Sequence, residues 1–482
     1  MGPSKLGVTS EIGTLRRLLV HSPDSSLGKV VPSKAQDWLF EDIVHLSTVR
    51  KNEYDFYTKI LMYFLDPEKI YGKLSHINSN ESNREFYKPD NPNFHRSEKV
   101  IELQLLLDEI LQDQDIRLNL VASVCAIESC SYEIQNQLHM LDGAELSKVF
   151  ISGSLTDGRM LFAPIPNFIF TRDIGVVVND HIILNRPAKI ARTREALLAK
   201  YIFHNHPIFE GFKGKIIEIE DTSHHFLMPI ETDVKKVTLE GGDLMMVSAN
   251  HLLVGVSERT TIEAAHQVIN VLFAKKIVDK ITVVRIPKKR DYMHIDTVFT
   301  QVKRNVWVML GDFSRKTINK EGADPIEKIL ESKRKVDQVT IIQFHRNDQE
   351  NPVYYETLED LLISISETDL KCSEEVVFIF SGNNEFPYDL REQWTDSCNV
   401  LALKEGVVLG YDRNDKTAEA FKAAGFQVIH VHELLEELES GKIKVSDLGD
   451  TLILMPSAEL SRARGGFHCM SMPLLRDELL NT

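Results

Sequence analysis

Four short segments of this chain concentrate charge and glycine where a buried strand would end. The first, Asn167–Asp173, sets an arginine and an aspartate after an aromatic pair. The second, Leu239–Asp243, has two glycines between Glu240 and Asp243, which suggests a tight turn that presents both carboxylates from fixed positions. Taken alone, such a turn most often holds solvated acids.

The other two segments hold the groups that could transfer protons or attack a carbon. In His294–Phe299, a strand would send His294 and Asp296 to the same face, so an imidazole and a carboxylate would share a cavity. In Arg462–Pro473, Cys469 follows two arginines and a glycine pair. Each signal is weak by itself, because a lone cysteine is more often a buried thiol than a nucleophile.

The four segments are more informative as a set. A thiol, an imidazole and at least three carboxylates, without metal-ligand spacing, suit attack on a carbon that is attached to a cation. The carboxylates would hold the cation while the thiolate adds to its central carbon. This set suggests a guanidinium substrate.

The apolar pattern of the remaining chain predicts an α/β fold that positions these segments. Helical spacing is found between short apolar runs, at Ile262–Phe273, Ala418–Ala424 and Glu433–Leu438. The runs that predict strands are Leu15–Val20, Ile182–Leu184, Ile216–Ile219, Leu252–Val256, Ile281–Ile286, Val306–Leu310, Val339–Phe344, Val376–Phe380, Gly406–Leu409 and Thr451–Met455.

Residues 47–146 are predicted to form a helical insertion, because strand-like runs are scarce there. Helices are expected at Tyr54–Leu65, Val100–Leu111 and Ser131–Leu141. The asparagine-rich piece Asn78–Asn93 is expected to be a surface loop.

The composition is that of a soluble globular protein, with 43% hydrophobic and 26% charged residues among 482. The formal charge of −15 argues against nucleic-acid or anionic-membrane partners and is compatible with a cationic ligand. The five cysteines lack the spacing of a disulfide framework or zinc cluster, and no apolar run approaches the ~18 residues of a membrane span. We therefore expect a cytoplasmic protein.

In their order and spacing, the segments PNFIFTRD, EGGD, HIDTVF and SRARGGFHCMSMP resemble arginine deiminase, a member of the guanidine-modifying pentein superfamily. The resemblance extends over nearly the whole chain and includes VTSEIGTLRRLLVHSP, GVSERT and REQWTDSCNVLAL. It implies a five-bladed ββαβ propeller with pseudo-fivefold symmetry, as one catalytic pentein domain over residues 1–482 that contains the helical insertion. It also implies hydrolysis of L-arginine to L-citrulline and ammonia without a metal or organic cofactor, and we expect a homo-oligomer, a dimer or larger.

The same resemblance implies roles for individual residues. Cys469 matches the nucleophile, His294 the general acid and base, and Glu240 the acid that orients the histidine. Asp173 and Asp296 match the two carboxylates that grip the guanidinium nitrogens. The residues expected to contact the rest of the substrate are Asn167, Arg192, Arg259 and Arg464 at its α-amino and α-carboxylate ends, and Leu39 and Phe170 along its aliphatic stem.

Two departures from the family pattern bear on the substrate. Ala463 stands where the family has the first glycine of GRGG, and Ser381–Glu385 replaces a CGGGD-like stretch. Three alternatives therefore stay open: an amidinotransferase, an arginine dihydrolase, and a pentein-fold binding protein without catalysis. We also expect a mainly neutral Cys469 thiol in the substrate-free enzyme, because the positive charge of the substrate should assist its deprotonation.

Overall fold

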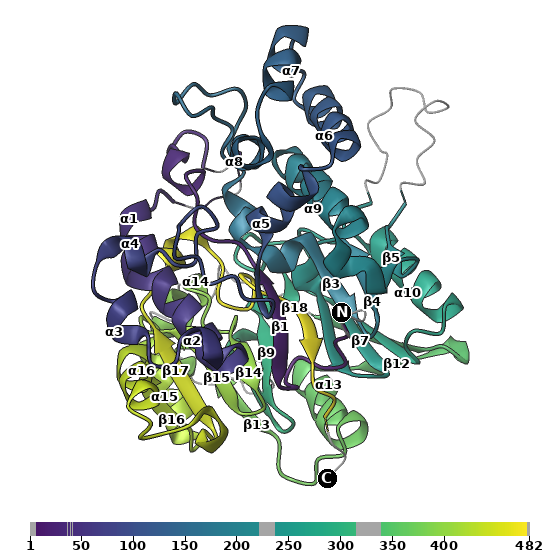
Figure 1. Ribbon diagram of the computed structural model, residues 1–482. Coiled ribbons are helices and arrows are strands. Elements are labelled where there is room, and N and C mark those ends of the chain that lie inside the picture. The colour runs from purple at the N-terminus through teal and green to yellow at the C-terminus, as the bar shows by residue number, and fades with distance from the viewer. Residues whose placement is uncertain are drawn as a thin grey trace.

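The computed structural model describes residues 6–479 except 36, 39, 41, 221–236 and 315–338. The described residues form an α/β fold with five β-sheets (Figure 1). The predicted fold class is therefore confirmed at the α/β level. Leu39, one of the predicted substrate contacts, lies outside the described residues.

Each of the five sheets contains a unit of three strands with the same arrangement. The first and second strands of the unit are antiparallel, and the third strand is parallel to the second. In chain order within each unit, the strands are β3 (Gly175–Val178), β4 (His181–Leu184) and β5 (Ile216–Ile217); β6 (Leu244–Ser248), β7 (His251–Val256) and β8 (Lys280–Arg285); β9 (Phe299–Lys303), β10 (Val306–Met309) and β13 (Val377–Phe380); β14 (Leu401–Lys404), β15 (Val407–Tyr411) and β17 (Thr451–Met455); and β18 (Met472–Arg476), β1 (Leu15–Val20) and β2 (Val100–Glu102). Two of the sheets are extended by β11 (Thr340–His345) with β12 (Asp348–Tyr355), and by β16 (Gln427–His430).

The fifth unit joins the two ends of the chain. Its antiparallel pair consists of β18 and β1, with Leu19 opposite Met472, and the two strands lie side by side in Figure 1. The inward-facing residues on both strands, such as Leu18, Leu19 and Leu474, are fully buried. The last described strand is therefore held in the fold by the first one.

Helices connect the parallel strands, as a parallel pair requires a crossover. The crossovers hold α9 between β4 and β5, α10 between β7 and β8, α13 between β10 and β13, and α15 with α16 between β15 and β17. The helices are α1 (Leu46–Thr48), α2 (Asp55–Leu65), α3 (Leu74–Ile77), α4 (Glu81–Arg84), α5 (Leu103–Ile110), α6 (Gln114–Ile127), α7 (Tyr132–His139), α8 (Gly143–Ser152), α9 (Thr193–Asn205), α10 (Ile262–Ala274), α13 (Leu358–Ser364), α14 (Tyr388–Trp394), α15 (Asp415–Ala423) and α16 (Val431–Glu439).

Two local predictions between residues 47 and 146 are wrong. The helix expected over Val100–Leu111 begins only at Leu103, because Val100–Glu102 is strand β2 and the Glu102 side chain accepts a hydrogen bond from Leu105 N as the helix N-cap. The expected loop Asn78–Asn93 contains α4, and its Phe86 and Tyr87 are buried in the core.

The sequence prediction missed the first strand of every unit, which are β3, β6, β9, β14 and β18, together with β2, β12 and β16. The first strands have four or five residues each. Their length does not explain the omission, because β4, β10 and β13 have four residues each and were predicted.

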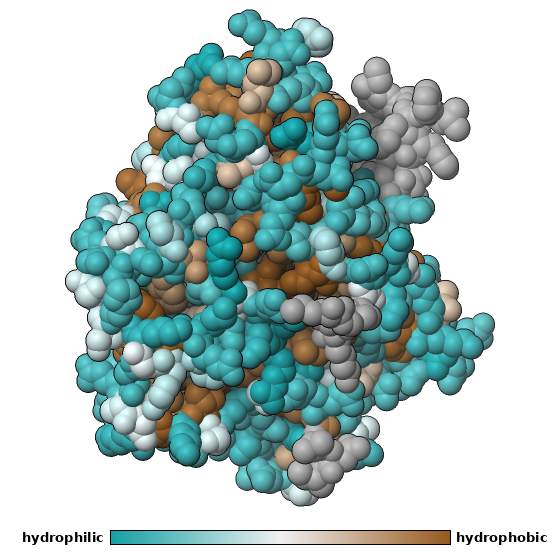
Figure 2. All heavy atoms as spheres, in the orientation of Figure 1, coloured by the Kyte–Doolittle hydropathy of each residue, from teal (hydrophilic) through white to brown (hydrophobic). Residues whose placement is uncertain are grey.

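The surface is in keeping with the composition. Hydrophilic residues predominate on the face drawn in Figure 2, and the chain has a formal charge of −15. Among the described residues, no helix is long and apolar enough to cross a membrane.

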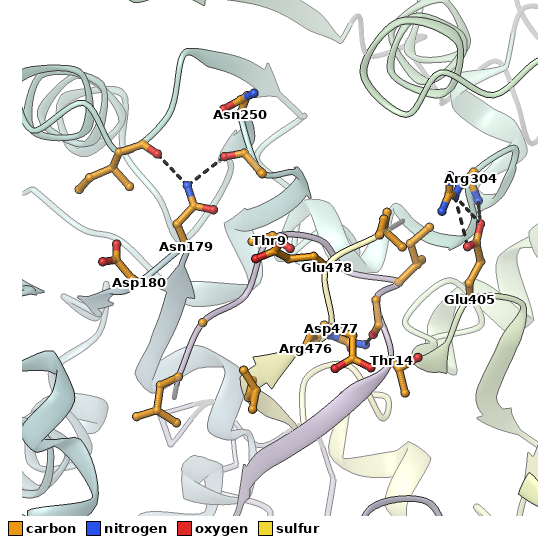
Figure 3. A pocket seen from close by; sticks show the side chains of 18 residues that line it. Thr9, Thr14, Asn179, Asp180, Asn250, Arg304, Glu405, Arg476, Asp477 and Glu478 are labelled. Atoms are coloured by element: carbon orange, nitrogen blue, oxygen red, sulfur yellow. Dashed lines mark hydrogen bonds and ion pairs between the residues drawn. The ribbon is translucent and has the colours of Figure 1, made fainter. Parts of the chain in front are cut away.

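A cavity of about 990 Å³ lies at the hairpin ends of the sheets (Figure 3). Its lining includes Asn179, Asn250, Arg304 and Glu405, from the turns that connect β3 to β4, β6 to β7, β9 to β10 and β14 to β15. None of the predicted site residues that the structure describes lines this cavity. Those residues precede the first strands, so the cavity and the candidate site lie at opposite ends of these strands.

Candidate active site

Four of the predicted catalytic residues come from equivalent places in the fold, shortly before the first strand of a unit. Asp173 lies in the 3₁₀ turn Thr171–Ile174 before β3, and Glu240 precedes the turn Gly241–Asp243 before β6. Asp296 lies in the turn Ile295–Thr297 before β9, and Cys469 lies three residues before β18. Short turns at the same end of four sheets therefore bring together side chains that are far apart in the sequence.

The conditional prediction that His294–Phe299 is a strand is wrong for every residue except Phe299, where β9 begins. Residues 295–297 form a 3₁₀ turn, in which Thr297 N donates to His294 O at 3.2 Å and Ile295 N donates to Asp243 Oδ1 at 3.0 Å. The Asp243 carboxylate is thus used to hold this turn. The side chains of His294 and Asp296 are both buried in the site, but they bind different partners.

Cys469 and Asp296 form one part of the site. The Cys469 sulfur lies 3.7 Å from Asp296 Oδ2, and the two residues are 4% and 0% exposed. Asp296 Oδ2 also lies 2.8 Å from His468 Nδ1. The backbone N–H of Cys469 donates to the Asn399 side chain at 3.0 Å, which fixes the cysteine loop.

His294, Glu240 and Asp173 form the other part. His294 Nε2 lies 3.0 Å from Glu240 Oε2, and His294 Nδ1 lies 3.9 Å from Asp173 Oδ1. The Arg192 guanidinium donates from Nη1 to Asp173 at 2.8 Å and to Glu240 at 3.1 Å, and from Nε to Glu195 at 2.8 Å. Glu240 is thus placed to orient the imidazole, and Arg192 offsets the charge of the carboxylates around it.

The predicted contacts for the rest of the substrate lie around this centre. The Asn167 amide donates to Trp38 O. Arg259 Nη1 lies 4.0 Å from Glu240 Oε1, and the Arg464 guanidinium lies 3.9 Å above the Trp394 ring. Phe170 packs against Gly465, where a Cβ atom would lie 2.2 Å from the Phe170 ring.

Electrostatics favour a neutral thiol and a protonated imidazole. Burial raises the pKa of Cys469 well above its ordinary value, and the charges of Asp296 and Asp173 raise it further. This direction agrees with the neutral thiol expected from the sequence. Burial lowers the pKa of His294, but the Asp173 charge and the Glu240 hydrogen bond outweigh it and raise that pKa to about 10.

Three of these groups could in principle hold a metal ion. Ligand atoms of Asp173, Glu240 and His294 all lie within 4.8 Å of one another. The same carboxylates already bind Arg192 and His294, however, so cationic side chains provide the positive charge that an ion would supply.

Several buried polar atoms in the site make no hydrogen bond within the described part of the chain. Between the two halves of the site, these atoms are Asp173 Oδ1, Asp296 Oδ1 and His294 Nδ1. Arg192 Nη2, Arg259 Nε, and Nε and Nη1 of Arg464 are also without a partner. Buried polar groups are nearly always satisfied, so these atoms mark where a polar ligand would be bound.

The sequence interpretation missed three residues of this site. Asn399 stands two residues before β14, as Asp173 stands two residues before β3, and this equivalence would have identified it. Glu11 binds Arg172 at 2.7 Å and His468 at 3.2 Å. Glu195, whose pKa burial raises to about 7, binds Arg192. Glu195 stands outside every segment singled out in the sequence, whereas Glu11 lies in the segment VTSEIGTLRRLLVHSP, which could have identified it.

The fold and the site define an α/β protein with a buried cysteine–histidine–carboxylate centre. Comparison with known families matches residues 132–476, most of the chain, to the family described as arginine deiminase. The chain therefore belongs to the arginine deiminase family. The resemblance inferred from the sequence motifs is confirmed.

Curated relatives match over nearly the full length. Arginine deiminase from Listeria monocytogenes serotype 4b (strain CLIP80459) is 28% identical over 488 residues, with 98% of each chain covered. The Treponema denticola arginine deiminase is 26% identical over 493 residues, which cover 98% of this chain and 99% of the relative.

Two solved structures are similar to this chain at low sequence identity. An amidinotransferase of saxitoxin biosynthesis from Microseira wollei is 13% identical, with a TM-score of 0.44 and 99% of each chain covered. A dimethylarginine dimethylaminohydrolase bound to S-methyl-L-thiocitrulline is 18% identical, with a TM-score of 0.35 over 64% of this chain and 76% of that one.

Proposed function

We propose that this chain is an arginine deiminase, which hydrolyses L-arginine to L-citrulline and ammonia. Family membership supports the reaction, and one observation on the site supports the residue roles. Asp173 Oδ1, Asp296 Oδ1 and His294 Nδ1 are buried beside the Cys469 loop and make no hydrogen bond among the described residues. Two carboxylate oxygens can hold a planar guanidinium by charged hydrogen bonds.

The proposed reaction begins with the guanidinium between Asp173 and Asp296. Cys469 loses its proton to solvent with the help of the substrate's positive charge, and the thiolate forms a bond from sulfur to the guanidinium carbon. His294 gives a proton to one terminal nitrogen, the carbon–nitrogen bond breaks, and ammonia leaves. A covalent thiouronium species remains.

Water completes the reaction. His294, now neutral, takes a proton from a water molecule whose oxygen attacks the same carbon. The carbon–sulfur bond then breaks, which releases citrulline and regenerates the thiol. Glu240 keeps the imidazole in position through both steps, at 3.0 Å from Nε2.

The remaining substrate contacts are proposed as they were inferred from the sequence. Arg192, Arg259 and Arg464 each have a buried guanidinium N–H group without a hydrogen-bond partner in the described chain, which supports contact with the α-carboxylate. Asn167 is proposed to contact the α-amino end, and Phe170 with Leu39 to contact the aliphatic stem. Ala463, which departs from the family pattern, is buried beside Arg464.

We also propose a five-bladed ββαβ propeller as the arrangement of the five sheets, with residues 1–482 as one catalytic domain and residues 47–146 as its helical insertion. The repeated strand order supports the propeller, since each unit is an antiparallel pair followed by a parallel strand. Helices α2 to α7 support the insertion, although strand β2 lies within its bounds. A cytoplasmic location and a homo-oligomer are proposed from the sequence alone.

Product analysis tests the function. Purified protein incubated with L-arginine should form citrulline and ammonia, and Cys469→Ala should form neither while it still binds arginine, because the ionic contacts remain. Ornithine as the product would indicate a dihydrolase, and amidino transfer to an added amine would indicate an amidinotransferase. Unchanged turnover by the Cys469→Ala variant would disprove the proposed nucleophile.

A further inference from the structure

His468 lies between two buried carboxylates, next to the proposed nucleophile. Its Nδ1 is 2.8 Å from Asp296 Oδ2, and its Nε2 is 3.2 Å from Glu11 Oε2. His468 itself is 3% exposed. Both ring nitrogens are thus used, and each one has a carboxylate oxygen as its partner.

The hydrogen bonds of His468 favour the ionised forms of both carboxylates. Burial opposes the ionisation of Glu11, but the charge of Arg172 and the hydrogen bond of His468 lower the pKa of Glu11 well below its ordinary value. Burial likewise opposes the ionisation of Asp296, and the His468 hydrogen bond lowers the pKa of Asp296. The Arg172 guanidinium also offsets the charge of Glu11.

The two oxygens of Asp296 differ in their surroundings. Oδ2 accepts from His468 and lies 3.7 Å from the Cys469 sulfur, whereas Oδ1 has no partner among the described residues. The hydrogen bond at Oδ2 restrains the rotation of the carboxylate and so limits the directions in which Oδ1 can point. The Glu11–Arg172 pair holds His468 from the other side, at 2.7 Å between Arg172 Nη2 and Glu11 Oε1.

We infer that His468 is a positioning residue for the proposed reaction: through Nδ1 it holds Oδ2 of Asp296 and so directs Oδ1 at the substrate guanidinium. This inference rests on the proposed function. His468 acts through Asp296 and need not touch the substrate. Its contact with Glu11 anchors the ring, and its contact with Asp296 sets the geometry of the reaction.

Two substitutions separate the two contacts. Asparagine has an amide nitrogen two bonds from Cβ, like Nδ1, and glutamine has one three bonds from Cβ, like Nε2. His468→Asn therefore keeps the donor to Asp296, and His468→Gln keeps the donor to Glu11. Both replace the imidazole by a neutral amide, so they are matched controls for each other.

We expect kcat/KM for arginine, measured as citrulline formed, to fall by less than roughly 10-fold in His468→Asn and by roughly 100-fold or more in His468→Gln, because small misplacements of a positioned group are costly. A purely structural role would lower both equally, in step with their melting temperatures. Equal activities, or a more active glutamine variant, would overturn the inference.

A binding measurement keeps this test independent of the proposed reaction. In the Cys469→Ala background, arginine should bind more weakly with His468→Gln than with His468→Asn, as measured by calorimetry. If the unmodified protein forms no citrulline, the proposed function fails. The binding contrast would then still decide the role of His468, and its absence would refute that role.

Discussion

At the scale of single residues, the site combines His294, an acid whose pKa is raised, with Cys469, a proposed nucleophile whose thiol pKa is also raised. The pKa of His294 is raised to about 10 against the effect of burial, by the Asp173 charge and the Glu240 hydrogen bond. Its contribution to folding stability is thus fully present below its ordinary pKa of 6.5 and is lost as pH rises through about 10. A protonated His294 is also the form that can give a proton to departing ammonia.

Removing the Glu240 charge should therefore shift the pH dependence of the reaction. Glu240→Gln removes a charge that raises the His294 pKa, so the decline of kcat/KM at high pH should begin at lower pH than in the unmodified protein. A pH series of citrulline formation measures this. Glu258→Gln removes the same charge from a partly exposed residue near Arg259 and should leave the decline in place. A shift to higher pH in the Glu240 variant would contradict the assigned cause.

At the scale of elements, the turn before β6 is packed closely against the side chain of His294. A Cβ atom on Gly242, in the turn before β6, would lie 2.6 Å from His294 Nδ1 and 2.7 Å from His294 Cγ. Gly242 is needed because the His294 ring packs directly against its backbone and leaves no space for a side chain. Its backbone conformation is not the reason, because Gly242 does not have a positive φ. The turn before β6 thus helps to place a side chain from the turn before β9.

Gly242→Ala should accordingly displace the imidazole. We expect kcat/KM to fall by roughly 100-fold, with the protein still folded, because the methyl group pushes the proton carrier away from the reacting atoms. Gly449→Ala is the matched control, since a Cβ there meets no atom within 4 Å, and it should leave kcat/KM unchanged. Full activity in the Gly242 variant would show that His294 can shift without loss.

At the scale of the whole molecule, the site depends on the pairing of β18 with β1. Cys469 precedes β18, and β18 is held beside β1 at the other end of the sequence. Leu474 on β18 is fully buried in the cluster that also contains Leu19 and Ile174. The pairing of β18 with β1 must therefore be stable for Cys469 to be held in the site.

Leu474→Ala should lower the free energy of unfolding by about 2–5 kcal/mol, the usual range for removing a fully buried leucine side chain. Urea denaturation followed by circular dichroism measures the change. Met140→Ala, at an 86% exposed position, should change the free energy by less than about 0.5 kcal/mol. A similar decrease in the free energy of unfolding in both variants would argue against the importance of the pairing between β18 and β1.

The sequence by itself determined the chemistry and the class of fold. Cys469, His294, Glu240, Asp173 and Asp296 were found because each lies in a short segment of unusual composition, and the α/β class followed from local apolar periodicity. Each of those signals comes from residues that are adjacent in the sequence. Each signal was weak by itself, and the order and spacing of the segments along the chain gave the family resemblance that implied the residue roles.

Only the tertiary structure decided how these groups are connected. The turn at Ile295–Thr297 is held by a contact from outside its own unit, because Asp243, which precedes β6, accepts the backbone N–H of Ile295. The partners of His468 come from positions 172 and 457 residues away. Such contacts are set by the packing of whole sheets. The residues adjacent to each partner in the sequence do not predict which distant residue it will contact.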